Sequence, residues 1–295
     1  MLARQANGSD RLSHPPPKPL DSIEPTDSSF GASRHAVIRM LEGLAFSSAL
    51  AAGIGGMLSL VSSRILESSS PASSALLAAA GTFIIYNLDR LRDVEQDRST
   101  SPRRTDYVSR NRLPLGVSIG IVALAFTATW WQASPAIKIL CLAIGIVGML
   151  HRRLKGIAVL KTIYVSGAWV AACVGIPWLS AELGFDGSRV ATWLAGILFS
   201  SLAANLIASN LRDDEAALIR GSSRATLWFA RVVLVAAIGL ALAAPSRLAP
   251  LVWIPLFEGL ALVAYRPTER YGHLVVDGAI GVGALASVLH LARFT

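Results

Sequence analysis

The sequence predicts an all-α, polytopic membrane protein, and two observations carry this prediction. The 295-residue chain is 53% hydrophobic and only 16% charged, whereas soluble domains carry about 25% charged residues. Its apolar residues also gather in long runs, most of about 17 to 25 residues, which is the length that an α-helix needs to cross a bilayer. Cys141 and Cys173 fall inside such runs, so we expect them to pack as small apolar residues rather than form a disulfide or bind a metal.

The first 34 residues differ from the rest of the chain. Residues 1–34 are polar, rich in Pro and Ser, and poor in large apolar side chains. Such a segment cannot bury enough apolar surface to fold, so we predict a disordered tail followed by one transmembrane domain, residues 35–295. The tail lacks the apolar core of a signal peptide and is expected to be retained.

Nine apolar segments follow, and we expect them to form about nine transmembrane helices bundled around a central cavity. Their approximate ranges are 37–62, 73–95, 114–132, 135–150, 157–180, 190–211, 225–244, 249–265 and 272–292. The fourth segment is short, and the eighth is interrupted by Pro250 and Pro255.

The distribution of positive charge predicts how the helices are oriented. Arginine and lysine are concentrated in the loops after the second, fourth, sixth and eighth segments. By the positive-inside rule these loops and the amino terminus lie on the cytoplasmic side of an integral multi-pass protein. The net charge of +8 is therefore attributed to topology, lipid headgroups or a diphosphate substrate, and not to nucleic acid.

A first acidic cluster lies at the end of the second segment. Asp89, Asp93 and Asp97 recur every four residues, so on a continuous helix each carboxylate stands only about 40° round from the last. Like charges stacked in this way repel one another, and a cation would offset the cost. Mg²⁺ commonly bridges a few carboxylates and substrate phosphates, so the cluster, with Asn87 before it, predicts a metal and phosphate site.

A second polar cluster lies at the corresponding end of the sixth segment. Its members are Asn205, Asn210, Arg212, Asp213 and Glu215. Polar side chains inside membrane helices are functional candidates by default. Because both acidic helix ends are expected on the same side, the pair suggests one cavity with a cluster on each wall.

The paired clusters resemble the UbiA superfamily of intramembrane prenyltransferases, which carry aspartate-rich motifs on helices 2 and 6. In the first motif, Asp93 and Asp97 match, Asp89 takes an Asn position, and Arg90 replaces the first Asp. The resemblance covers roughly residues 37 to 292.

The second motif fits less completely. Arg212, Asp213 and Glu215 match it, Asn210 falls one residue late, and Ala217 stands where the last Asp belongs. In the basic loop between segments 4 and 5, Lys155 matches a family lysine that helps to hold diphosphate.

The resemblance implies Mg²⁺-dependent transfer of a prenyl group from an isoprenoid diphosphate to an acceptor, which in the family is mostly aromatic. The implied metal ligands are Asp89, Asp93, Asp97, Asn210, Asp213 and Glu215. With the polar residues beside these motifs, the expected diphosphate contacts are Lys155, Lys161, Arg212, Arg224, Asn87 and Asn205. The implied catalytic residues are Asp93, Asp97, Asp213 and Lys155.

Two other functions fit the same residues. The cavity could cyclise the prenyl chain without an external acceptor, as some members of the superfamily do. Alternatively, Arg90 and Ala217 could mark a non-catalytic member that binds isoprenoids. At the start of the ninth segment, His273 and Asp277 are one turn apart, and Asp277 is expected to face the bundle or the mouth of the cavity.

Overall fold

The computed structural model describes residues 28–154, 158–181, 185–212 and 222–293, and within these residues every regular element is a helix. The chain comprises two compact units, residues 1–38 and 39–295. Helix α1 (Ser28–Phe46) begins inside the segment that we expected to be a disordered tail, and residues 1–27 lie outside the described part. The description that follows concerns the second unit.

The membrane class predicted from the sequence is confirmed by helix length and hydropathy. Among the described residues, seven helical segments are long and apolar enough to span a bilayer, or eight if the bent pair formed by α1 and α2 (Ala49–Ile65) is one span. The uninterrupted spans are α3 (Pro71–Arg92), α6 (Arg112–Gln132), α10 (Phe185–Arg212) and α11 (Ser223–Ala243). The predicted fourth segment forms α7 (Pro135–Leu154), whose apolar part, Pro135–Leu150, is shorter than a span.

Three further spans are interrupted by a change of helix type. The first runs through α8 (Ala158–Val170), a π-helical turn (Ala171–Gly175) and α9 (Ile176–Leu179). The second joins a 3₁₀ helix (Ser246–Val252) to α12 (Trp253–Val263), and the third joins α13 (Glu269–Tyr271), a π-helical turn (Gly272–Val276) and α14 (Asp277–Ala292). Pro177 and Pro250 lie in the first two, where a missing backbone N–H forces a different hydrogen-bond pattern.

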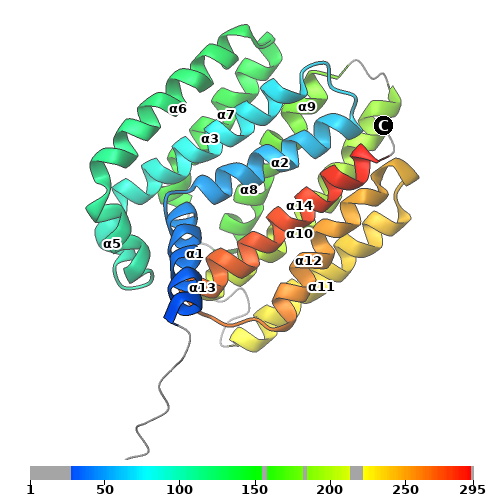
Figure 1. Cartoon of the computed structure of the whole chain (residues 1–295). Coiled ribbons are helices and arrows are strands. Elements are labelled where there is room, and N and C mark those ends of the chain that lie inside the picture. The colour runs from blue at the N-terminus through cyan, green and yellow to red at the C-terminus, as the bar shows by residue number, and fades with distance from the viewer. Residues whose placement is uncertain (1–27, 155–157, 182–184, 213–221, 294–295) are drawn as a thin grey trace, which may run out of the picture. The chain divides into compact units, whose positions relative to one another are not determined.

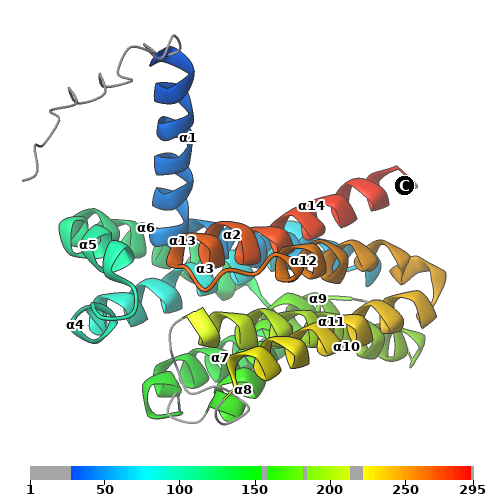
Figure 2. The same cartoon turned by 90° about the horizontal axis from the view of Figure 1, so that it is seen from below.

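The long helices of the second unit pack as a sequence of neighbours. In this sequence each helix contacts the next, in the order α6, α3, α2, α14, α12, α11, α10, α8 and α7 (Figure 1). Figure 2 shows α2, α12 and α14 on one side of this unit and α7, α8, α10 and α11 on the other. The ends of α3 and α10 and the starts of α8 and α14 are therefore brought into one region.

The main apolar core joins α2, α10, α12 and α14. Leu58, Leu194, Leu198 and Ile254 are all fully buried in it. At Gly283 of α14, an added Cβ would come within 2.6 Å of the Ile254 Cα, so these two helices touch backbone to backbone. Close contact through a small residue is typical of helix packing in membranes.

The first predicted segment, 37–62, is wrong as a single straight helix. The chain bends by 71° between α1 and α2, and Ser48 at the break has a left-handed φ of 61°. Carbonyl groups freed by a break inside a membrane protein need other donors. Arg90 Nη1 supplies them, donating to the carbonyls of Ala45 (3.0 Å) and Phe46 (2.8 Å) and to Ser48 Oγ (2.8 Å).

We predict that Arg90→Ala destabilises the protein by about 2–3 kcal/mol, because it leaves three buried acceptors without their charged donor. The free energy of unfolding, measured by titration with a denaturing detergent, tests this. The matched control is Arg92→Ala, which removes an exposed arginine of the same helix and should change stability by no more than about 0.5 kcal/mol. Equal effects of the two substitutions would contradict the assignment.

Candidate active site

A cavity of about 630 Å³ lies among α2, α3, α6, α7, α8, α10 and α14. Its volume falls within the range of about 300–1,000 Å³ that is typical of small-molecule sites. Most of its wall is apolar, with Ile54, Leu77, Phe126 and Ile176 among the lining residues. The charged lining residues come from the end of α3, from α4 and α5 beyond it, and from the starts of α8 and α14. The cavity therefore combines an apolar body with one polar end.

All three aspartates of the first motif line this cavity. Helix α3 ends at Arg92 and a four-residue helix, α4 (Val94–Asp97), follows Asp93. Backbone hydrogen bonds nevertheless run from Asp93 N to Asp89 O and from Asp97 N to Asp93 O, each 2.9 Å. The four-residue period thus keeps the aspartates on the cavity side, as the spacing predicts. Asp93 is the most enclosed, with 4% of its surface exposed.

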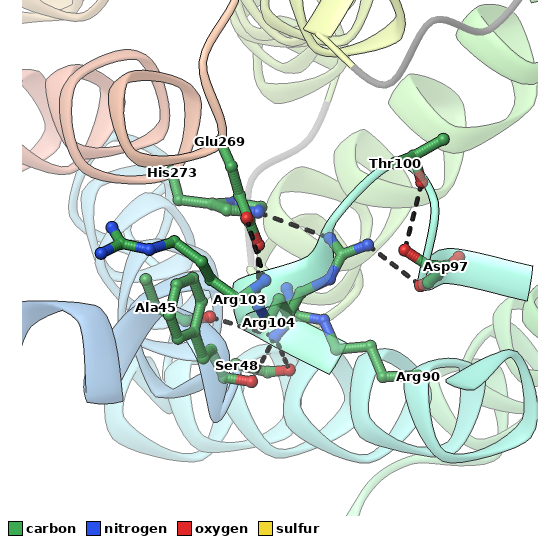
Figure 3. Close-up of polar contacts among 10 residues, drawn as sticks. Ala45, Ser48, Arg90, Asp97, Thr100, Arg103, Arg104, Glu269 and His273 are labelled. Carbon is green, nitrogen blue, oxygen red and sulfur yellow. Dashed lines mark hydrogen bonds and ion pairs between the residues drawn. The ribbon is translucent and has the colours of Figure 1, made fainter. Parts of the chain in front are cut away.

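Asp97 belongs to a hydrogen-bonded chain that reaches the last span (Figure 3). Arg104 Nη2 donates to Asp97 Oδ2 at 3.0 Å, and Arg104 Nη1 lies 3.4 Å from His273 Nε2. His273 Nδ1 in turn lies 3.2 Å from Asp277 Oδ2. All four residues line the cavity, so one guanidinium connects the first acidic motif with the polar start of the ninth predicted segment.

Arg104 is held in place by an unusual helix cap. It lies on α5 (Pro102–Arg110), whose first backbone N–H groups have no partner within the helix. The Glu269 carboxylate accepts from the N–H of Arg104 at 2.8 Å and of Arg103 at 3.3 Å. Glu42 accepts from Arg103 Nη1 at 3.0 Å and from Arg270 Nε at 2.8 Å. Two carboxylates therefore tie α5 to neighbouring elements at the polar end of the cavity.

A lysine and three aromatic side chains from α3 and α8 line the cavity. Lys161 of α8 lines the cavity and is 9% exposed. Trp169 Nε1 donates to Tyr86 Oη at 3.0 Å, and the two rings meet edge to face with centroids 6.1 Å apart. Tyr164 also lines the cavity. The aromatic faces are attractive surroundings for a positively charged organic group.

Two of the predicted asparagines, Asn205 and Asn87, lie in different surroundings. Asn205 lines the cavity, and its buried Nδ2 has no hydrogen-bond partner among the described residues. Asn87 is fully buried, and its Nδ2 donates to the carbonyls of Ser47 (3.0 Å) and Phe83 (2.9 Å). The structure therefore places Asn87 at the α1–α2 break rather than among the cavity-lining residues.

The second motif is only partly described. Asn210 is 2% exposed, and neither side-chain polar atom has a partner in the described part of the chain. Arg224 is exposed at the start of α11 and is not among the cavity-lining residues. Arg212 is the last residue of α10. Its side chain lies outside the described part, as do residues Lys155, Asp213, Glu215 and Ala217.

The charges at the polar end suit an added cation. Among the described residues, four carboxylates line the cavity, namely Asp89, Asp93, Asp97 and Asp277. Three cationic side chains accompany them, namely Arg90, Arg104 and Lys161. No group of three or more His, Cys, Asp or Glu side chains in ranges 28–154, 158–181, 185–212 and 222–293 is arranged to hold a metal ion. The donor set itself, carboxylate oxygen in excess, is the one that Mg²⁺ prefers.

Several cavity residues were not found by sequence reasoning. Tyr86, Arg104 and Ser209 line the cavity. Tyr86 precedes Asp89 by about one helical turn, so its position could have been inferred from the first motif. Arg104 could not, because its role depends on how α5 folds back over the cavity.

No family model, curated protein or solved structure matches the chain. The functional interpretation therefore depends on the residues and on the geometry of the cavity.

We predict that Glu269→Ala loosens α5, because it removes the carboxylate that caps the helix from outside. Loss of a helix cap costs about 1 kcal/mol, which corresponds to about fivefold faster exchange of the α5 amide protons. Hydrogen–deuterium exchange of residues 98–110 measures this.

The control for this experiment is Glu95→Ala. Glu95 pairs only at the exposed surface with Arg98, at 3.5 Å, and such pairs contribute little. The capping role fails if α5 exchanges at the same rate in Glu269→Ala as in the wild type.

Proposed function

We propose that the protein is an intramembrane prenyltransferase of the UbiA type, which transfers a prenyl group from an isoprenoid diphosphate to an acceptor within the membrane. The observation that carries the proposal is the cavity itself. Asp89, Asp93 and Asp97 line its polar end together with Lys161, while most of its wall is apolar. A prenyl diphosphate has the same two parts, an anionic head and a hydrocarbon tail.

The diphosphate head is assigned to the acidic end with metal ions as intermediaries. Carboxylates alone repel an anion, and in the described part they outnumber the cationic side chains of the cavity. Asp89, Asp93 and Asp97 would hold Mg²⁺, with Asn210, Asp213 and Glu215 as the proposed ligands of the second motif. When bound, Mg²⁺ neutralises the negative charge that develops on the leaving diphosphate.

The cationic side chains complete the proposed diphosphate site. The Lys161 ammonium is a compact donor suited to phosphate oxygen, and its placement on the cavity wall supports this role. Lys155 and Arg212 are proposed to help it, as the family resemblance implies. Asn205 of α10 also lines the cavity and offers an amide. The cavity geometry does not support Arg224 and Asn87 as diphosphate contacts, because neither is a cavity-lining residue.

The apolar body of the cavity suits the prenyl chain. As the bond between the allylic carbon and the diphosphate oxygen breaks, both electrons leave with the diphosphate and positive charge develops on the allylic carbon. Tyr86, Tyr164 and Trp169 present aromatic surfaces there, which attract a cation. The apolar wall also excludes water, which would otherwise capture the cation. The acceptor nucleophile then bonds to this carbon and loses its proton.

The number of membrane spans and their orientation are part of the same proposal. Nine spans around a central cavity would count the bent pair α1–α2 and the short helix α7 as one span each. The acidic motifs and the amino terminus would face the cytoplasm, consistent with the arginine-rich loops.

We predict that the purified protein releases diphosphate from geranylgeranyl diphosphate in the presence of Mg²⁺, and that membrane extract stimulates the release by supplying an acceptor. Asp93→Ala should lower the rate at least about 100-fold, because it removes a proposed ligand of the Mg²⁺ that would stabilise the leaving diphosphate. Diphosphate release is followed with a coupled phosphate assay.

The matched control is Asp106→Ala, which removes an exposed aspartate outside the cavity and should leave the rate unchanged. A protein that releases no diphosphate from any C10–C20 prenyl diphosphate across a panel of acceptors would refute the proposed function. A terpene formed without acceptor would instead assign the cyclase reaction.

A further inference from the structure

The start of the last span contains a local distortion at the cavity wall. Gly272–Val276 forms a π-helical turn between α13 and α14, and the cavity is lined by His273 within this turn and by Asp277 directly after it. Such single π turns are uncommon and are frequently found at functional sites. His273 is packed edge-on against Phe46, with ring centroids 6.1 Å apart, so the imidazole has a defined orientation.

The direction of the hydrogen bonds follows from the donors available. A guanidinium can only donate, so the contact between Arg104 Nη1 and His273 Nε2, 3.4 Å, requires Nε2 to be the acceptor. The proton of a neutral imidazole is then on Nδ1, which donates to Asp277 Oδ2 at 3.2 Å. This contact fixes the orientation of the Asp277 carboxyl group.

The two side chains differ in what they present to the cavity. The side chain of His273 is 6% exposed, whereas that of Asp277 is 30% exposed. Asp277 is therefore the member of the pair that a ligand in the cavity meets. Ile280 of α14 and Ile54 of α2 line the same cavity. An ionised carboxylate beside an apolar wall selects a ligand with an O–H or N–H donor on an apolar body, and it repels an anion such as diphosphate.

We infer that Asp277, oriented by His273, is the binding site for the hydroxyl or amino group of the acceptor substrate. This assignment rests on the proposed function, because it places the acceptor on the α14 wall and the diphosphate on the α3 and α8 walls of one cavity. Asp277 is the contacting residue, while His273 and Arg104 are positioning residues. Arg104 also pairs with Asp97, so the two substrate sites share one guanidinium.

The inference predicts a preference that can be measured without any turnover. We would compare the binding of 4-fluorophenol and of 4-fluoroanisole to the purified full-length protein by ¹⁹F NMR. The two probes differ in that the ether lacks the donor proton. The wild type should bind the phenol about tenfold more tightly, since a hydrogen bond to a charged group contributes about that much. Asp277→Ala should abolish the preference.

Three further variants make the result specific. Asp106→Ala removes an exposed aspartate and should retain the full preference. His273→Ala leaves Asp277 in place without its orienting partner and should reduce the preference. If Asp277→Ala does not fold, Asp277→Asn replaces it and should lower the preference about threefold, because a neutral amide oxygen is a weaker acceptor.

Equal binding of the two probes by the wild type would overturn the inference, as would a preference that survives in Asp277→Ala. Neither Mg²⁺ nor diphosphate is present in this experiment. If the probes bind equally but diphosphate release is normal, only the assignment of the acceptor site is refuted. If no diphosphate is released, the proposed function is refuted.

Discussion

The arrangement of the cavity depends on how negative charge is neutralised at one end of an apolar helix bundle. Carboxylates from α3, α4 and α14 meet there, and in a membrane protein their mutual repulsion is only weakly screened by water. The Arg104 guanidinium reaches both Asp97 and His273. Because Glu269 fixes the start of α5, this cation is held in position by the fold. Asp89 and Asp93 line the same end of the cavity, where the proposed function places the metal ions.

Arg90 stands where the first motif of the UbiA superfamily has an aspartate, and the structure gives this arginine a role of its own. An aspartate at this position could not donate to the carbonyls exposed where α1 and α2 meet. Arg90 and Asn87 together supply those donors, so part of the acidic segment stabilises the bend while Asp89, Asp93 and Asp97 face the cavity. The segment from Asn87 to Asp97 thus has two faces with different roles.

Much of this could be predicted from periodicity, and the rest depends on long-range contacts. The four-residue spacing of Asp89, Asp93 and Asp97 places them on one face, and hydropathy predicts most of the spans. The bend at Ser48 was missed because its stability comes from Arg90, some 40 residues away. The spacing of His273 and Asp277 predicts a shared face, but the link to Asp97 through Arg104 requires α5 to lie over the cavity. Of the predicted second-motif ligands, only Asn210 has a described side chain.

The most direct test of the central claim is electron paramagnetic resonance of Mn²⁺, substituted for Mg²⁺, in the presence of a thiolodiphosphate analogue of geranylgeranyl diphosphate. If the acidic end of the cavity holds the metal and the diphosphate together, Mn²⁺ bound to the wild type will show coupling to ³¹P. The Asp93→Ala protein will not bind Mn²⁺. A Mn²⁺ signal that the protein leaves unchanged, or one that is identical in Asp93→Ala, would contradict this account of the cavity.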